Sequence, residues 1–151
     1  MNRESKQSND LFYVCSMIEN IARITKNTRK DTVNALGLRN IEKLYNLADV
    51  YHCENVDKVA DEFIEAANIP RGVFDNVAEC EYKVPTHWEI GRVYSRLINA
   101  ISAERENAQH SNTLFEVYNS WITESIDNYN SDMYYSSPDY IFQSYKHGCV
   151  I

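Results

Sequence analysis

Apolar side chains recur at steps of three and four residues along almost the whole chain. This spacing places them on one face of an α-helix. The clearest example lies between residues 86 and 101, where the stripe consists of Ile90, Val93, Tyr94, Leu97, Ile98 and Ile101. The segments that carry such a pattern are residues 11–25, 28–37, 38–50, 55–67, 86–101, 111–126 and 139–146. We therefore predict an all-α fold, a bundle of six or seven helices.

Residues with known capping preferences stand at the expected ends of these helices. Thr86 and Glu89 form a capping box, in which the Thr hydroxyl accepts from the Glu amide and the Glu carboxylate reaches back to the Thr amide. Ser137 followed by Pro138 is typical of a helix start, because proline is tolerated at the first helical position. Gly37 is expected to end the helix that opens at Thr28 or Asp31.

The chain is predicted to be a single domain with short tails. Its 151 residues are enough for one well-filled core. Residues 68–85 hold two prolines and a glycine and are predicted to be one long ordered connection. A cap at residue 8, 9 or 10 would leave 1–9 as a disordered N-terminal tail. The helical domain would then span 10–146, with 147–151 as a C-terminal tail.

Charge and composition narrow the classes of partner. Residues 1–50 carry eight Lys/Arg and six Asp/Glu, whereas 51–151 carry seven and sixteen, which together give the net charge of −7. Such an acidic chain is not suited to non-specific binding of nucleic acid or anionic membranes. The sequence shows neither a signal peptide nor an apolar run of membrane-spanning length. We expect a cytoplasmic protein whose four cysteines are reduced.

The few candidates for chemistry are scattered. His52, His87 and Arg92 are candidate ligand-binding residues of a small enzyme or ligand binder, since a His at a helix start beside an Arg can hold an anion or move a proton. A metal site is not expected, because Cys53 directly follows His52 and Cys80 stands alone, unlike the tight ligand pairs of zinc sites. We expect no cofactor and no catalytic residue.

A second alternative is a DNA-binding regulator. Within residues 23–43, four basic residues precede a short helix, a glycine turn and another helix, in the outline of a helix-turn-helix. The second of these helices offers few donors to a groove, and the outline is common in all-α proteins. Nucleic acid is therefore not the partner that we expect.

The most unusual feature is the density of aromatic residues near the end of the chain. Nine of the eighteen aromatic residues lie between residues 115 and 145. Tyrosine is favoured at interfaces because it buries a large area at a low entropic cost and keeps a polar tip. The candidate partner-binding residues are Tyr134, Tyr135, Tyr140 and Phe142. The alternative is that this segment folds back onto its own core.

Three segments carry a resemblance to a family of small, uncharacterised, all-helical bacterial proteins: LYNLADVYHCENVDKVADEFI (44–64), VPTHWEIGRVYSRLI (84–98) and EVYNSWITESIDNYNSDMYYSSPDYIFQSY (116–145). Residues 11–66 also resemble small helical domains of unknown function that are encoded near ADP-ribosyltransferase-like toxin genes. The resemblance assigns no functional residue, but it implies an accessory or antitoxin-like role. We therefore expect a non-catalytic protein-binding module whose partner is another protein or a second copy of itself.

Overall fold

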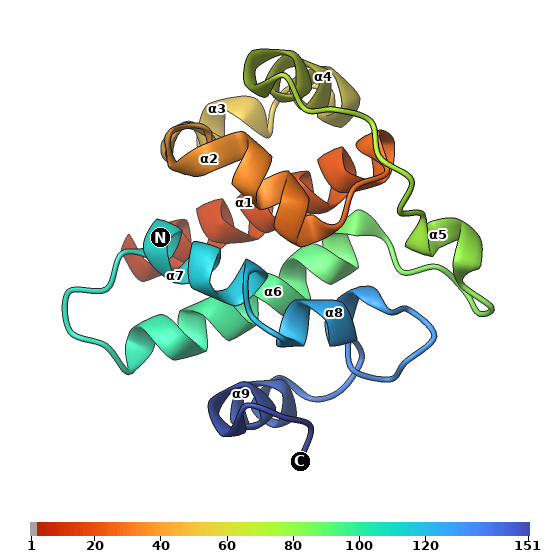
Figure 1. Cartoon of the computed structure of the whole chain (residues 1–151). Coiled ribbons are helices and arrows are strands. Elements are labelled where there is room, and N and C mark those ends of the chain that lie inside the picture. Colours follow the sequence, from red (N-terminus) through yellow and green to blue (C-terminus); the bar gives the residue numbers. More distant parts are fainter. Residues whose placement is uncertain (1–2) are drawn as a thin grey trace.

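The computed structural model describes residues 3–151 and is helical, with no strand in that range. Two long helices, α1 (Arg3–Thr25) and α6 (His87–Ala103), cross at the centre of the bundle (Figure 1). The other helices are α2 (Arg29–Asn46), α3 (Ala48–Tyr51), α4 (Val56–Ala67), α5 (Asn76–Glu79), α7 (His110–Tyr118), α8 (Ile122–Asp127) and α9 (Pro138–His147). The predicted all-α fold class is thus confirmed, with nine helices in the described residues instead of six or seven.

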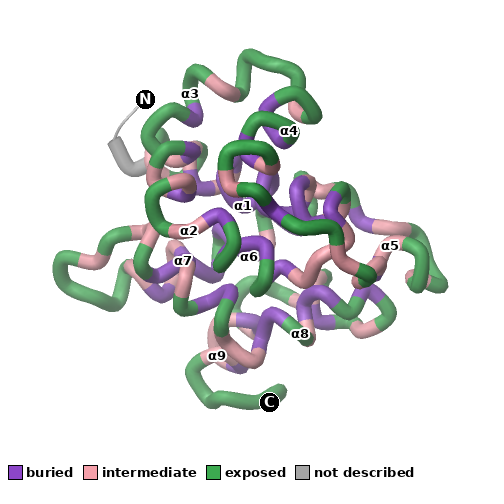
Figure 2. The backbone as a smooth tube through the Cα atoms, turned by 45° about the horizontal axis from the view of Figure 1, so that its top comes forward, coloured by how far each residue is buried: buried purple, intermediate pink, exposed green. Residues whose placement is uncertain are grey.

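The central pair carries much of the hydrophobic core, which appears in Figure 2 as buried stretches along α1 and α6. The other helices are arranged around this pair: α2 and α4 cover α1, α7 packs on α2 and α6, and α9 closes the far side of α6 (Figure 1). The predicted stripes of both central helices face this core. Its fully buried members in the central pair include Leu11, Val14, Ile18, Ile21, Ile90, Tyr94 and Ile98.

The two central helices approach each other most closely at Gly91. A Cβ atom on this residue would lie 2.0 Å from the Ser16 Oγ and 2.7 Å from the Ser16 Cα and N atoms. A glycine is therefore required where α6 crosses α1, because any larger residue would push the two backbones apart.

The predicted caps are confirmed where side chains accept from backbone amides. Thr86 accepts from the Glu89 amide at 3.0 Å, and Ser137 accepts from the Tyr140 amide at 3.2 Å. Asn55 and Thr28 cap α4 and α2 in the same way. Gly37 has a φ of +76° and kinks α2 at the position where two separate helices were expected.

The N-terminal boundary was predicted wrongly. Helix α1 begins at Arg3, so residues 3–9 are helical and not a disordered tail, while residues 1–2 of that tail lie outside the described part. The candidate caps at positions 8–10 lie inside the helix. An ion pair between Lys6 and Asp10, with 2.9 Å between Nζ and Oδ2, stabilises this first part, as pairs four residues apart do on a helix surface.

The segment predicted as one helix over 111–126 is instead two helices, α7 and α8, with a break at residues 119–121. Side chains compete with the helical backbone there. The hydroxyls of Ser120 and Thr123 both donate to the Val117 carbonyl, at 2.6 and 2.9 Å. Asn119 and Asn34 exchange two amide hydrogen bonds of 3.1 and 2.9 Å, which fasten the break to α2.

Two further boundaries also differ from the predictions. The helix expected over 38–50 ends at Asn46 and is followed by the separate α3. Leu38, the first apolar residue of that segment, is 43% exposed and does not face the core. The connection over 68–85 is ordered, as predicted, but contains the short helix α5. It is attached to the turn between α1 and α2, because the Gly72 and Phe74 amides each donate to a backbone carbonyl of Thr25 or Lys26 at 2.8 Å.

Candidate functional site

The four predicted partner-binding residues lie in different environments. The Tyr135 side chain is 69% exposed, whereas Tyr134, Tyr140 and Phe142 are half-buried and pack against the core. The Tyr140 hydroxyl donates to the Ile151 carbonyl at 2.6 Å, and the Lys146 Nζ lies 4.9 Å from the centre of the Phe142 ring. The segment is thus partly folded onto its own core, and the two tyrosines before α9 are separate from the two aromatic residues on it.

Tyr134 and Tyr135 belong to a surface that also includes two residues outside the predicted set. A hollow of about 580 Å³ is lined in part by Tyr82, Tyr129, Tyr134 and Tyr135. We call these four residues the tyrosine surface. The Tyr134 ring stands edge-on to that of Tyr129, with 5.9 Å between centroids, and to that of Tyr135, with 5.1 Å. Tyr82 is 67% exposed and comes from the connection before α6.

Hydrogen bonds join the two loops that carry these rings. Asn130 donates from its amide nitrogen to the Glu79 carbonyl at 3.0 Å, and its amide oxygen accepts from the Glu81 backbone at 2.7 Å. Ser131 donates to the Ser125 carbonyl at 2.9 Å. The loop after α8 is therefore fastened both to the loop after α5 and to α8 itself.

Beneath the tyrosine surface lies a buried charge network. The Glu19 carboxylate accepts from the Arg29 guanidinium at 2.8 and 2.6 Å and from the Arg23 Nε at 2.7 Å. The Tyr129 hydroxyl donates to the same carboxylate. Glu19 and Arg29 are almost completely buried, at 1% and 0% exposed. Removing one member of such a pair leaves an uncompensated charge in the core, which typically costs about 3–5 kcal/mol.

Asp127 is a second buried acid beside this network. Its carboxylate accepts from the Tyr94 hydroxyl at 2.7 Å and from the Arg29 backbone amide, so it caps the first turn of α2. Its backbone carbonyl accepts from the Asn76 side chain at 2.8 Å. Asp127 thereby connects α8 to α2, α5 and α6, and it lines a cleft of about 380 Å³.

The two buried acids differ in pKa because the guanidinium of Arg29 is hydrogen-bonded to the carboxylate of Glu19. Burial by itself would raise the pKa of Glu19, but Arg29, Arg23 and the Tyr129 hydroxyl outweigh it and lower that pKa to about 2. Burial raises the pKa of Asp127 to about 7, and Glu19 adds to this effect, against the opposing influence of Arg29 and Tyr94. The network thus holds one permanent carboxylate and one acid that titrates near neutral pH.

The three candidate ligand-binding residues His52, His87 and Arg92 do not line a common pocket. His52 lines an apolar groove between α1, α3 and the start of α6, and its Nδ1 lies 3.2 Å from the Ala48 carbonyl oxygen. The His87 ring lies tilted against the Trp88 ring, with 4.6 Å between centroids, and the Arg92 guanidinium lies 4.4 Å from the centre of the Phe12 ring. The arrangement does not form the joint acid–base or anion site considered for these residues.

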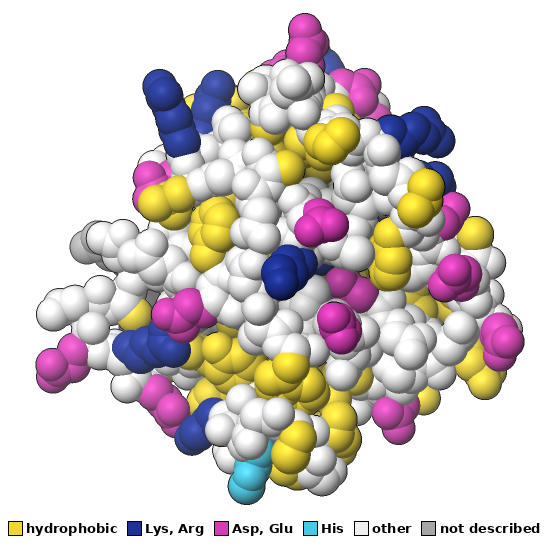
Figure 3. All heavy atoms as spheres, in the orientation of Figure 1, with side chains coloured by type: hydrophobic (Ala, Val, Ile, Leu, Met, Phe, Trp, Pro, Cys, Tyr) yellow, Lys and Arg dark blue, Asp and Glu magenta, His cyan; other side chains and the backbone are white. Residues whose placement is uncertain are grey.

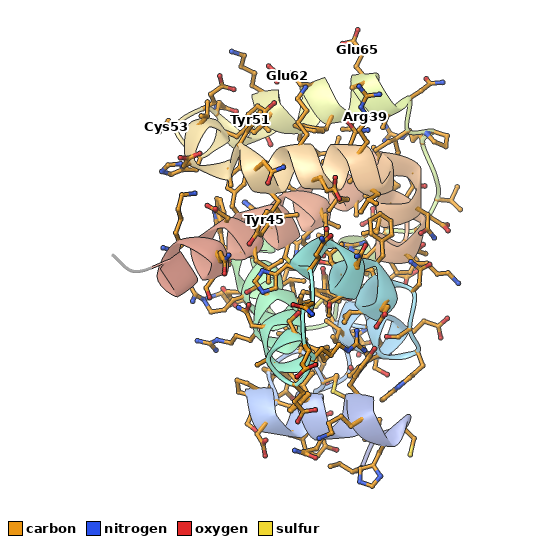
Figure 4. The ribbon with its side chains drawn as sticks, turned by 90° about the vertical axis from the view of Figure 1, so that its left-hand side faces the viewer. Arg39, Tyr45, Tyr51, Cys53, Glu62 and Glu65 are labelled. Atoms are coloured by element: carbon orange, nitrogen blue, oxygen red, sulfur yellow. The ribbon has the colours of Figure 1, made fainter. Side chains whose placement is uncertain are left out.

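Most of the basic residues between positions 23 and 43 have partners within the protein. Arg23 and Arg29 belong to the buried network, and the Lys26 Nζ lies 2.9 Å from Asp75. The Lys43 Nζ lies 5.8 Å from the centre of the Phe63 ring, where the second half of α2 packs against α4. Arg39 is exposed on this part of α2 (Figure 4). On the face seen in Figure 3, basic side chains are scattered among acidic ones.

The cysteines and histidines do not gather either. Within residues 3–151, no group of three or more His, Cys, Asp and Glu side chains is placed to hold a metal ion. All four cysteines are free; Cys15 is buried, whereas Cys53 is exposed near Tyr51, at the outer end of α3 (Figure 4). Among the described helices, none combines the length and apolar character that crossing a bilayer requires.

Sequence reasoning missed Glu19, Arg29, Asp127 and Tyr129. One signal was available, because Glu19 lies four residues after Cys15 and three before Ala22, at the spacing of the buried stripe. An acid at such a position requires a buried cation, and Arg23 and Arg29 are the nearest arginines in sequence. Comparison of this chain with known protein families, with curated proteins and with solved structures yields no match.

Proposed function

We propose that this chain is a non-catalytic protein-binding module and that the tyrosine surface is its binding site. The observation that carries the proposal is that two rings about two-thirds exposed, Tyr82 and Tyr135, line one hollow. The rest of its lining consists of Tyr129, Tyr134 and the polar residues 130–132. Tyrosine is among the residue types that contribute most to binding at interfaces, and such residues sit in pockets from which water is excluded.

The support beneath the surface favours binding without rearrangement. Tyr129 is held by the buried network, and Tyr134 packs edge-on against it. Because the rings are ordered before a partner arrives, binding loses less conformational entropy. The acidic balance of residues 51–151, seven basic against sixteen acidic residues, favours a partner with a basic face. More specifically, we propose that the protein acts in the bacterial cytoplasm, either as an accessory protein or by neutralising a toxin.

The test is a variant that removes both exposed rings, Tyr82→Ala with Tyr135→Ala. Both rings are largely in solvent, so the free energy of unfolding should change little. Affinity for the partner should fall by about 2 kcal/mol or more, roughly thirtyfold, as expected of an interface hot spot. The matched control is Val73→Ala, whose side chain is completely exposed in the connection between α4 and α5.

The measurement compares the proteins captured from bacterial lysate by the parent, the double variant and the control, followed by light scattering for self-association. A protein held by the parent and the control but lost by the double variant would support the proposal. If that protein is an ADP-ribosyltransferase-like toxin, the result would also support the toxin-neutralising role. Equal capture and equal assembly by all three proteins would contradict it.

A further inference from the structure

The apolar groove between α1, α3 and the start of α6 has features that the proposed protein-binding role does not use. It holds about 460 Å³, within the range of sites for small molecules, and its walls are the rings of Phe12, Tyr13 and Trp88 and the methyl group of Ala48. Trp88 is 37% exposed, and its ring lies 5.7 Å from that of Phe12 and 6.4 Å from that of Tyr13. Three aromatic rings therefore meet at one opening.

Within residues 3–151, two buried polar atoms close to Trp88 have no hydrogen-bond partner. They are the Tyr13 hydroxyl and the His87 Nε2, and both rings pack against Trp88. The Tyr13 side chain is 95% buried, since only 5% of it is exposed. Both atoms are closed off from solvent, so the groove offers a ligand the faces of the aromatic rings and not these two polar atoms.

The charges around the groove favour a positively charged ligand. Lys6 lies at its rim between two acids, paired with Asp10 at 2.9 Å and close to Asp49. Burial raises the pKa of the Tyr13 hydroxyl to about 12, and the charges of Glu54 and Glu62, which do not line the groove, add to this effect. The hydroxyl therefore stays protonated.

A cation at this opening also gains from the rings. The faces of Trp, Tyr and Phe attract cations within about 6 Å of the ring centre. The basic group nearest to the groove on α6 is Arg92, whose guanidinium already lies over the Phe12 ring, 4.4 Å from its centre. The rings of Tyr13 and Trp88 are not among those with a cation placed over them in residues 3–151.

We propose that this groove is a second binding site, separate from the tyrosine surface, and that it takes a small organic amine with an aromatic body. The aromatic body lies against Trp88, and the ammonium group faces Asp49 and the face of the Tyr13 ring. The site recognises the combination of a positive charge and a flat apolar group.

The test uses three probes of the same shape: phenethylamine, phenethyl alcohol and hydrocinnamate, which carry a positive, a neutral and a negative head group. Trp121→Phe leaves Trp88 as the single tryptophan, so that its fluorescence reports on the groove, and calorimetry on the unsubstituted protein checks this variant. The amine should bind saturably and at least about tenfold more tightly than the carboxylate, with the difference shrinking at high salt because the attraction is screened.

Two conservative variants test the named contacts. Tyr13→Phe keeps the ring face that the ammonium group contacts and should leave binding of the amine within about twofold. Asp49→Asn should reduce the preference for the amine over the alcohol, whereas Asp31→Asn, an exposed acid on α2, should leave it unchanged. Thermal melts confirm that each variant is folded.

Three results would overturn the proposal. They are the absence of saturable binding of the amine, equal binding of all three probes, and an unchanged preference for the amine in Asp49→Asn. Self-association that depends on Trp88, and that excludes the amine, would show that a second copy of the chain occupies the groove and would also reject a small amine. The tyrosine surface is not touched by these variants, so partner capture by the same proteins distinguishes this proposal from the proposed function.

Discussion

At Gly91, a single missing methyl group sets the distance between the two central helices. Alanine is a better helix former than glycine by about 1 kcal/mol, so propensity alone would favour Gly91→Ala. The structure reverses this expectation, because the added Cβ would lie 2.7 Å from two backbone atoms of Ser16, which cannot rotate away.

We therefore expect Gly91→Ala to lower the free energy of unfolding by about 1–3 kcal/mol, the usual cost of overpacking a core. Urea denaturation measures the change. Combining Gly91→Ala with Ser16→Ala should not restore stability, because the close contact with the Ser16 backbone remains. Full recovery in the double variant would mean that the side-chain oxygen alone sets the spacing.

At the scale of an element, side chains at the helix ends decide where helices start and stop. Helix α6 begins where the Thr86 hydroxyl accepts from the Glu89 amide, and it supplies half of the central pair. The break between α7 and α8 has the same kind of origin, because two hydroxyls occupy the Val117 carbonyl that a continuous helix would use.

We expect Thr86→Ala to destabilise the protein by about 0.5–2 kcal/mol, because it leaves an amide of the first turn without an acceptor. Thr86→Ser keeps the hydroxyl and should retain most of the stability. Denaturant melts of the two variants check this, and the slope should not change because the folded structure is the same. Equal losses in both variants would point to the methyl group of Thr86 and not to its cap.

At the scale of the whole molecule, the buried acids make stability depend on pH. The pKa of Asp127 is raised from 3.8 to about 7 on folding, so between these values the folded protein holds a proton that the unfolded chain releases. Stability from this group is therefore greatest at low pH and is lost as the pH rises towards 7. Glu19 acts in the opposite sense: its pKa is lowered, and its contribution is lost as the pH falls from about 4.5 towards 2.

We expect Asp127→Asn to abolish the loss of stability that Asp127 causes as the pH rises. The free energy of unfolding of the parent minus that of the variant should decrease as the pH is raised from about 4 to about 7, and should then stay constant. Taking this difference cancels the contribution of the histidines, two of which, His87 and His110, have pKa values that burial lowers. The control is Asp139→Asn on the exposed first turn of α9, which removes a carboxylate outside the buried network. A curve for Asp127→Asn that rises over this range would show that Arg29 outweighs burial.

Much of the fold was predictable because its determinants are local. The stripes of α1 and α6, the caps at Thr86 and Ser137 and the kink at Gly37 all depend on residues within one or two helical turns. The break at residues 119–121 was not predictable in this way, because it is fastened by Asn34 from another helix. The early start of α1 was missed because polar residues at 8–10 look like caps when the Lys6–Asp10 pair is ignored.

The candidate sites were predicted only in part. Aromatic density near the end of the chain indicated Tyr134 and Tyr135, but it said nothing of Tyr82, which joins the same surface from the connection before α6. His52 was singled out for its chemistry and does line a groove, yet the feature that distinguishes this groove is the set of aromatic rings of Phe12, Tyr13 and Trp88. Nothing in the sequence around Tyr13 distinguishes it from the apolar core residues of the same helix.

The sequence by itself determined where helices form and which of their faces are buried, because hydrogen bonds within a helix and capping side chains act over a few residues. Only the tertiary structure decided which charges are paired, since Glu19 meets Arg29 ten residues away and Tyr129 at a separation of 110 residues. It also decided which rings remain in solvent. The physical reason is that burial and electrostatic pairing depend on distance in space, which the chain sets only when its helices pack.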